Sequence, residues 1–117
     1  MNPYGAPEIT AKEAAERAAR GRLLLIDVRE EEEVVGSLLQ IPGILRVPLS
    51  RLSEEQEAAL GDIQQNYEQS LAVLSDHGVR SAQVTMWLRR KGWHNAVNIR
   101  GGAVAWMREV RTGGVAH

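Results

Sequence analysis

The sequence contains no cysteine and no long apolar run, and each absence excludes a class of protein. Without cysteine, the 117-residue chain can form no disulfide, no cysteine-ligated zinc site and no thiol intermediate. A membrane-spanning helix requires roughly 18 or more apolar residues in succession, and the chain has no such stretch. The first residues also lack the basic and apolar regions of a signal peptide. We therefore expect a cytoplasmic protein that has no membrane contact.

Neither sign of charge is in marked excess. Fourteen lysines and arginines face fifteen acidic residues, for a net charge of -1, which argues against a general nucleic-acid binder. His77, His94 and His117 lack the spacing of metal ligands, so we expect neither a metal nor a cofactor. Phenylalanine is absent and aromatic residues make up 4% of the chain, which predicts an aliphatic core. The remaining composition is that of one globular domain.

Short apolar runs alternate with helical patterns along the chain. Thr10 with Glu13, and Ser53 with Gln56, have the spacing of capping boxes at two helix starts. The alternation predicts an α/β domain with a parallel sheet, helices on both faces and a site beyond the carboxyl ends of the strands. Strands are expected at 8–10, 22–28, 44–47, 70–75 and 95–99, and helices at 11–20, 29–35, 53–61, 81–91 and 103–110.

The loop that follows the strand at 70–75 is the first candidate site. It reads Ser-Asp-His-Gly-Val-Arg and leads directly into a helix, whose unpaired N–H groups and dipole favour negative charge. Gly78 permits a tight turn, and Arg80 adds a positive charge. We expect the main-chain amides of residues 76–80 to surround a common centre and to form an anion-binding loop. The alternative is an ordinary strand-to-helix turn in which Arg80 forms a structural ion pair.

Other polar and aromatic residues have simpler structural explanations. Asp27 and Arg29 lie at the carboxyl end of the strand at 22–28; they could face the loop, but we expect a charge pair that fixes the neighbouring turns. The acidic run at 30–33 could be a partner-docking patch but is more typical of a solvated helix start. Trp87 and Trp106 could line a pocket but lie on apolar helix faces and are expected in the core.

Four stretches together resemble the rhodanese-like domains. They are LLLIDVREEEE (23–33), QIPGILRVPLSRL (40–52), SDHGVRSAQVTMWLRRKGWHNAVNIRGG (75–102) and GGAVAW (101–106). The resemblance covers residues 8–110, between a flexible lead at 1–7 and a flexible tail at 111–117. It implies a three-layer α/β fold with a mainly parallel, five-stranded sheet and helices on both faces.

The resemblance also implies a site. Active members carry a cysteine that takes sulfur from a donor such as thiosulfate and passes it on as a persulfide, and Ser75 occupies that position. The anion-binding loop would consist of Asp76, His77, Gly78, Val79, Arg80 and Ser81, with Asp27, Arg29, Gly101 and Gly102 around it. Its length, with four residues between Ser75 and Arg80, resembles the sulfurtransferases and not the related phosphatases. The implied partners are a small sulfur-containing anion or the thiol or persulfide of another protein. The resemblance also implies a monomer.

Two positions depart from the family pattern. Ser75 cannot make the sulfur–sulfur bond of a persulfide, and a serine hydroxyl stays neutral at pH 7 even in a field that ionises a thiol. Gln40 stands where active relatives often have histidine, within a longer segment at 36–43. We therefore expect no sulfur transfer by this chain.

Three hypotheses follow. The chain is a sulfurtransferase domain whose nucleophile was replaced, in nature or deliberately, or it is a natural non-catalytic module that binds an anion or a protein. The third is a serine hydrolase that uses Ser75, His77 and either Asp76 or Asp27. His77 is only two residues from Ser75 and is expected to point outward, and no G-x-S-x-G motif is present, which disfavours the hydrolase.

Overall fold

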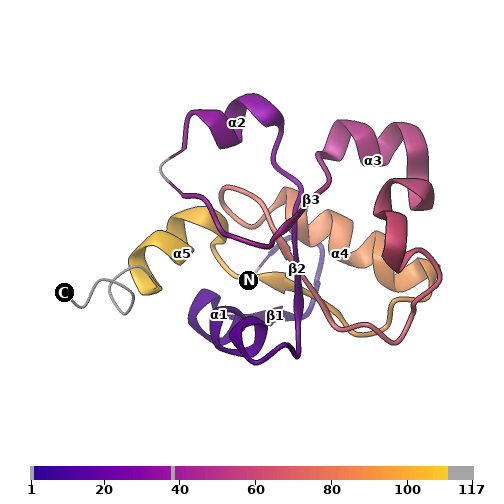
Figure 1. Cartoon of the computed structure of the whole chain (residues 1–117), viewed down its shortest axis with the longest axis horizontal. Coiled ribbons are helices and arrows are strands. Elements are labelled where there is room, and N and C mark those ends of the chain that lie inside the picture. Colours follow the sequence, from indigo (N-terminus) through magenta and orange to yellow (C-terminus); the bar gives the residue numbers. More distant parts are fainter. Residues whose placement is uncertain (1, 38, 111–117) are drawn as a thin grey trace.

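The computed structural model describes residues 2–37 and 39–110 and contains one five-stranded sheet (Figure 1). All neighbouring strands are parallel, and their order is β1-β5-β4-β2-β3. The predicted parallel α/β architecture is thus confirmed, and each expected strand is present. The tail predicted at 111–117 lies outside the described residues. The strands are β1 (Glu8–Ile9), β2 (Leu24–Asp27), β3 (Leu45–Arg46), β4 (Leu71–Leu74) and β5 (Ala96–Ile99).

Helices cover both faces of this sheet and make three layers. The helices are α1 (Ala11–Ala19), α2 (Glu31–Val35), α3 (Leu49–Glu55), α4 (Arg80–Lys91), α5 (Gly102–Glu109) and the 3-10 helix η1 (Gln56–Ile63). Helices α1 and α5 lie side by side on one face, whereas α3, η1 and α4 cover the other (Figure 1). Within the described ranges, no helix is both long and apolar enough to cross a bilayer.

The central strand β4 divides the core between the two faces. Its residues alternate in direction, as in any strand. Leu71 and Val73 pack under α4, and Ala72 and Leu74 pack under α1 and α5. Because all four side chains are fully buried, β4 must be a continuous apolar run, as the sequence indicated.

The three tryptophans differ in burial. Trp106 is 6% exposed and lies in the core, as predicted. Trp93, which the sequence pattern did not place, is fully buried and has its ring 4.7 Å from that of Tyr67. Trp87 packs against the core but is only half-buried, so it also reaches the surface.

The helix predicted at 53–61 begins elsewhere, and its capping box is wrong. Helix α3 starts at Leu49, so Ser53 lies within it, and Gln56 ends it with a φ of 57°. The N-terminus of α3 is stabilised from another element, because the Glu30 carboxylate accepts hydrogen bonds from the N–H and the hydroxyl of Ser50. A local motif cannot reveal a cap supplied by a residue twenty positions earlier.

Side-chain hydrogen bonds stabilise the start of α1 and the residues before β1. The Thr10 hydroxyl accepts a hydrogen bond from the Glu13 N–H at 3.1 Å, which confirms the predicted helix cap. Ahead of β1, the Asn2 side chain bonds to Ala6 and Glu8. These contacts place the segment 2–7 against the domain, and its flexibility stays a prediction.

Candidate functional site

The predicted loop lies between the end of β4 and the start of α4, beside α2 and the N-terminus of α5 (Figure 1). Its first residue, Ser75, is 1% exposed. Gly78 has a φ of 87°, and a Cβ atom there would come within 3.0 Å of the Gly101 nitrogen and 3.2 Å of the Ile99 carbonyl. Only glycine therefore fits the turn that brings the chain back toward the Ser75 side chain.

The Ser75 hydroxyl is the centre of a closed hydrogen-bond network. Its Oγ accepts bonds from the N–H groups of Gly78 and Ser81, both at 3.2 Å. It donates to Ser81 Oγ at 2.9 Å, and that hydroxyl donates in turn to Asn98 Oδ1 at 2.6 Å. Two amides of the loop and helix start are thus aimed at the side chain of residue 75. The hydroxyl itself is saturated.

Helix α5 holds the loop from behind. The N–H groups of Ala103 and Val104 donate to the carbonyl oxygens of Ser75 and Asp76, at 2.8 and 3.2 Å. A Cβ atom at Gly102 would lie 2.2 Å from the Ser75 carbonyl oxygen, so this close approach requires glycine. In a trans peptide the N–H points opposite to the carbonyl. The amides that follow these two carbonyls therefore face away from α5.

Arg80 is paired with an acid of α2. Its guanidinium donates to both carboxylate oxygens of Glu33, at 2.9 Å for the Nη1–Oε1 contact. The Arg80 hydrogen bond is the main reason why the pKa of Glu33 falls from 4.5 to about 2. In return, the carboxylate raises the pKa of Arg80. The structural ion pair considered for Arg80 is therefore the arrangement found, and its charge is largely compensated.

Asp27 and Arg29 form the predicted structural pair. Both side chains are at most 2% exposed, and Arg29 Nη2 lies 2.8 Å from Asp27 Oδ2. Arg29 Nε also donates to Asp27 Oδ1 at 3.0 Å. The Asp27 carboxylate raises the pKa of Arg29. The pair fixes the β2 end beside the loop.

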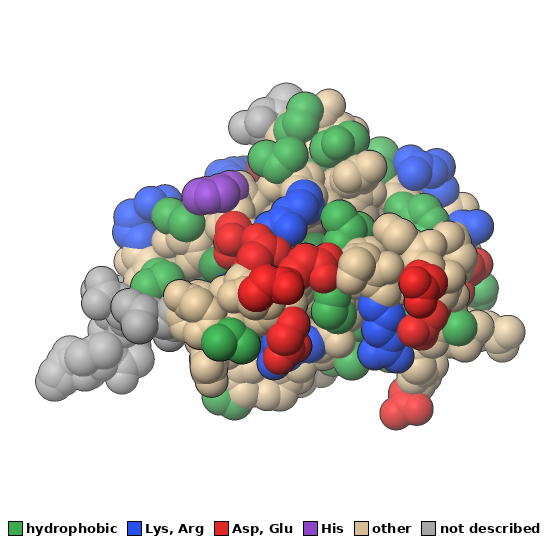
Figure 2. Space-filling view, turned by 90° about the horizontal axis from the view of Figure 1, so that it is seen from above, with side chains coloured by type: hydrophobic (Ala, Val, Ile, Leu, Met, Phe, Trp, Pro, Cys, Tyr) green, Lys and Arg blue, Asp and Glu red, His purple; other side chains and the backbone are tan. Residues whose placement is uncertain are grey.

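Asp76 extends this group of charges to the mouth of the loop. Its Oδ1 lies 3.8 Å from Arg29 Nη1, and its side chain is 35% exposed. Burial and the neighbouring Glu33 carboxylate raise the pKa of Asp76. The face that carries α2 accordingly shows clustered carboxylates with basic side chains beside them (Figure 2).

Replacing Glu33 by glutamine tests the Arg80 ion pair. Glu33 has a depressed pKa, so its stabilising effect is present at neutral pH and is lost as the pH falls from 4.5 toward 2. We expect Glu33→Gln to lower the free energy of unfolding by about 0.5–1 kcal/mol at neutral pH, because the pair is partly exposed and Asp76 loses a like-charged neighbour. The difference from the parent should vanish near pH 2. Urea unfolding across this range measures it.

Glu32→Gln is the matched control, because Glu32 is exposed on the same helix. It should leave stability nearly unchanged. An equal loss in both variants would mean that the acidity of α2, and not the Arg80 contact, is responsible.

The remaining loop side chains face solvent. His77 and Val79 are exposed. The Ser75 hydroxyl donates to Ser81 Oγ and not to a histidine, which removes the geometry that a Ser–His pair requires. Among the residues that the structure describes, no three histidine or acidic side chains are grouped as metal ligands.

The sequence did not single out two residues that shape the loop. Asn98 lies fully buried in β5, accepts from Ser81, and donates to the Gly78 carbonyl at 3.0 Å. A polar residue in an apolar strand was the available signal. Glu33 was expected only in a solvated helix start, and nothing local indicates its contact with Arg80.

A buried side chain at the carboxyl end of a central parallel strand, facing the N-terminus of the next helix, occupies the position where α/β proteins hold anions and nucleophiles. Comparison with known proteins defines the class further. The model of the Rhodanese-like domain family matches residues 10–109. The chain belongs to the rhodanese-like domain family.

The relatives include single-domain sulfurtransferases. The chain is 30% identical over 113 residues to a thiosulfate:glutathione sulfurtransferase from Homo sapiens, covering 90% of this chain and 96% of that one. A sulfurtransferase from Allochromatium vinosum is 27% identical over 86% of this chain and 88% of its own length.

Solved structures agree with this assignment. A human single-domain sulfurtransferase superposes with a TM-score of 0.73 at 30% identity, covering 90% of this chain and 98% of that one. A rhodanese-related protein from Thermoplasma volcanium gives 0.72 at 27% identity, over 89% and 93%. The rhodanese-like fold expected from the sequence is confirmed.

Proposed function

We propose that this chain is a rhodanese-like domain that keeps the loop of a sulfurtransferase but does not transfer sulfur. The observation that carries the proposal is the Ser75 hydroxyl, buried and bonded to the N–H groups of Gly78 and Ser81. The loop is built to stabilise a negatively charged atom at this place. The atom present is a neutral oxygen.

Sulfur transfer from thiosulfate needs a thiolate. The thiolate attacks the outer sulfur, a sulfur–sulfur bond forms, and sulfite leaves with the electron pair of the broken bond. The resulting persulfide gives its outer sulfur to cyanide as thiocyanate, which restores the thiolate. Serine offers no such sulfur, and its hydroxyl proton is already committed to Ser81. This supports an inactive site.

The charges around the loop favour a non-catalytic module for a protein partner over one for a free anion. Arg29 and Arg80 contribute two positive charges, whereas Asp27, Glu33 and Asp76 contribute three ionisable carboxylates, each within reach of one of these arginines. With every carboxylate ionised the group carries -1, so little positive field remains for a dianion such as thiosulfate. A thiol or persulfide presented by a protein needs no such field.

A direct assay tests the inactive state. The chain, given thiosulfate and cyanide, should produce thiocyanate no faster than a Ser75→Ala variant, because neither side chain can carry sulfur. Thiocyanate formation is followed by its coloured ferric complex. Turnover above the Ser75→Ala background would refute the proposal.

A further inference from the structure

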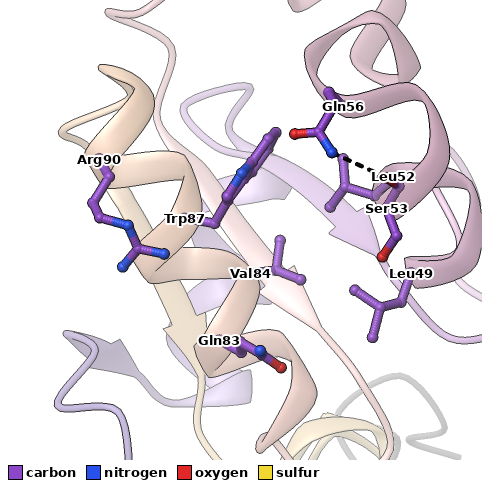
Figure 3. Close-up of a pocket in the computed structure, with 8 residues that line it drawn as sticks. All are labelled: Leu49, Leu52, Ser53, Gln56, Gln83, Val84, Trp87 and Arg90. Carbon is purple, nitrogen blue, oxygen red and sulfur yellow. Dashed lines mark hydrogen bonds between the residues drawn. The ribbon is translucent and has the colours of Figure 1, made fainter.

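A groove of about 310 Å³ lies between α3 and α4 (Figure 3). The described residues that line it are not those of the hydrogen-bond network around Ser75. Its floor is apolar. Leu52 and Val84 are buried there, and Leu49 and Trp87 are half-buried. The Trp87 ring extends from α4 toward Gln56 and forms one wall (Figure 3). A half-buried tryptophan beside an apolar floor is typical of a site that accepts another side chain.

The rim of the groove is polar. Ser53, Gln56 and Gln83 are exposed, and among the residues that the structure describes Arg90 is the charged one that lines the groove. No hydrogen bond or ion pair is formed by the Arg90 side chain with the described part of the chain. Lys91 Nζ lies 5.9 Å from the centre of the Trp87 ring, but its charge is offset by the Glu57 carboxylate 3.9 Å away, so Arg90 is the rim charge that counts here. An acidic group on an occupant would complement this rim.

The backbone at the rim is held in an uncommon conformation. Gln56 has φ 57° and ψ -139°, a region that residues with side chains rarely adopt. Its side chain donates to the Ser53 carbonyl at 3.0 Å and so lies along the groove edge (Figure 3).

The groove and the loop both adjoin α4. Helix α4 begins at Arg80, directly after the loop, and the Gln83 N–H bonds to the Val79 carbonyl in its first turn. Trp87 lies two turns along the helix, about 10 Å from its start. An extended segment of about three residues spans this distance. A partner anchored at Trp87 can therefore reach the loop with a residue close to its anchor.

We propose that this groove docks a segment of a protein partner, in which an apolar side chain packs on Trp87 and Val84 and an adjacent carboxylate pairs with Arg90. The inference rests on the proposed function, since it names the kind of partner that the loop would meet. The exposed rim favours a side chain from a larger partner over an enclosed small molecule, which a pocket would bury almost completely. The partner is an acidic segment with leucine or an aromatic residue as its anchor.

Peptide titration of the ¹⁵N-labelled full chain tests the docking without any sulfur chemistry. The probes are acetyl-Glu-Leu-Leu-Glu-amide, its Lys-Leu-Leu-Lys counterpart and its Glu-Ser-Ser-Glu counterpart. The acidic leucine peptide should shift the Trp87 indole and Val84 amide resonances saturably. Trp93 and Trp106, both buried, are internal references. The lysine peptide should bind about threefold to tenfold more weakly, and the serine peptide should not bind.

Reversing the charge at the rim is a second test of the docking. Arg90→Glu should invert the preference between the acidic and the lysine peptides, whereas Arg108→Glu, an exposed position on α5, should not. Unchanged spectra with the acidic leucine peptide would overturn the proposal. So would equal binding of 4-methylpentanoate, which would indicate a small acid, or shifts that depend on protein concentration alone, which would indicate a second copy. Each outcome is independent of activity, so the proposed function is judged separately.

Discussion

Replacing Ser75 by cysteine is expected to give this chain sulfur-transfer activity. The new thiol would stand where the N–H groups of Gly78 and Ser81 already converge, at the N-terminus of α4. Those donors favour the thiolate and lower the thiol pKa. At thiosulfate concentrations high enough to offset weak binding by the charge-compensated loop, we expect thiocyanate production from thiosulfate and cyanide to rise by about 100-fold or more over the parent chain. Mass spectrometry should then detect a persulfide, one sulfur atom heavier, on the variant treated with thiosulfate alone.

A thiol elsewhere is the matched control. Ser53→Cys places the same group on the exposed rim of α3, away from the amides of the loop, and should not produce thiocyanate. If folded Ser75→Cys also fails, more than the missing thiol keeps the site inactive. The longer segment at 36–43 and the compensated charges of Arg29 and Arg80 would then be the candidate causes, and the protein-binding role would be strengthened.

Loss of the buried arginine at the end of β2 should have the largest effect on stability. Arg29→Met leaves the Asp27 carboxylate, 1% exposed, without its guanidinium partner. Breaking one side of a buried ion pair costs about 3–5 kcal/mol. Native domains have a total stability of about 5–15 kcal/mol. We therefore expect a much lower urea midpoint with an unchanged m-value.

A double variant separates the lost pair from lost packing. Asp27→Asn combined with Arg29→Met removes the uncompensated charge and should recover a large part of the loss. If the double variant is as unstable as Arg29→Met alone, the arginine stabilises the domain through its packing and its bond to the Ser37 hydroxyl, and not through Asp27.

The sequence predicted those parts of the fold that depend on local pattern. The apolar run of β4 and the capped start of α1 at Thr10 are encoded in neighbouring residues, and so is the strand-to-helix loop at Ser75. The predicted start of α3 was wrong because the group that caps this helix, the carboxylate of Glu30, comes from another element.

In the site, too, contacts between near neighbours in the sequence could be predicted and contacts made by the fold could not. Asp27 and Arg29 are two residues apart, and their pairing could be predicted. Glu33 and Arg80 are separated by 47 positions, so only the fold brings them together. Their contact changes the chemistry of the loop, because it compensates the one charge that the sequence assigned to anion binding. The buried role of Asn98 likewise depends on the pairing of β5 with β4.

The support that α5 gives to the loop has a consequence for the order of assembly. In the described part of the chain, the carbonyls of Ser75 and Asp76 accept hydrogen bonds from the N–H groups of Ala103 and Val104, far along the chain. During synthesis, a nascent polypeptide that has not yet reached Val104 has β4 and α4 but lacks one or both of these donors. The turn around residue 75 is therefore among the last features of the domain to become fixed.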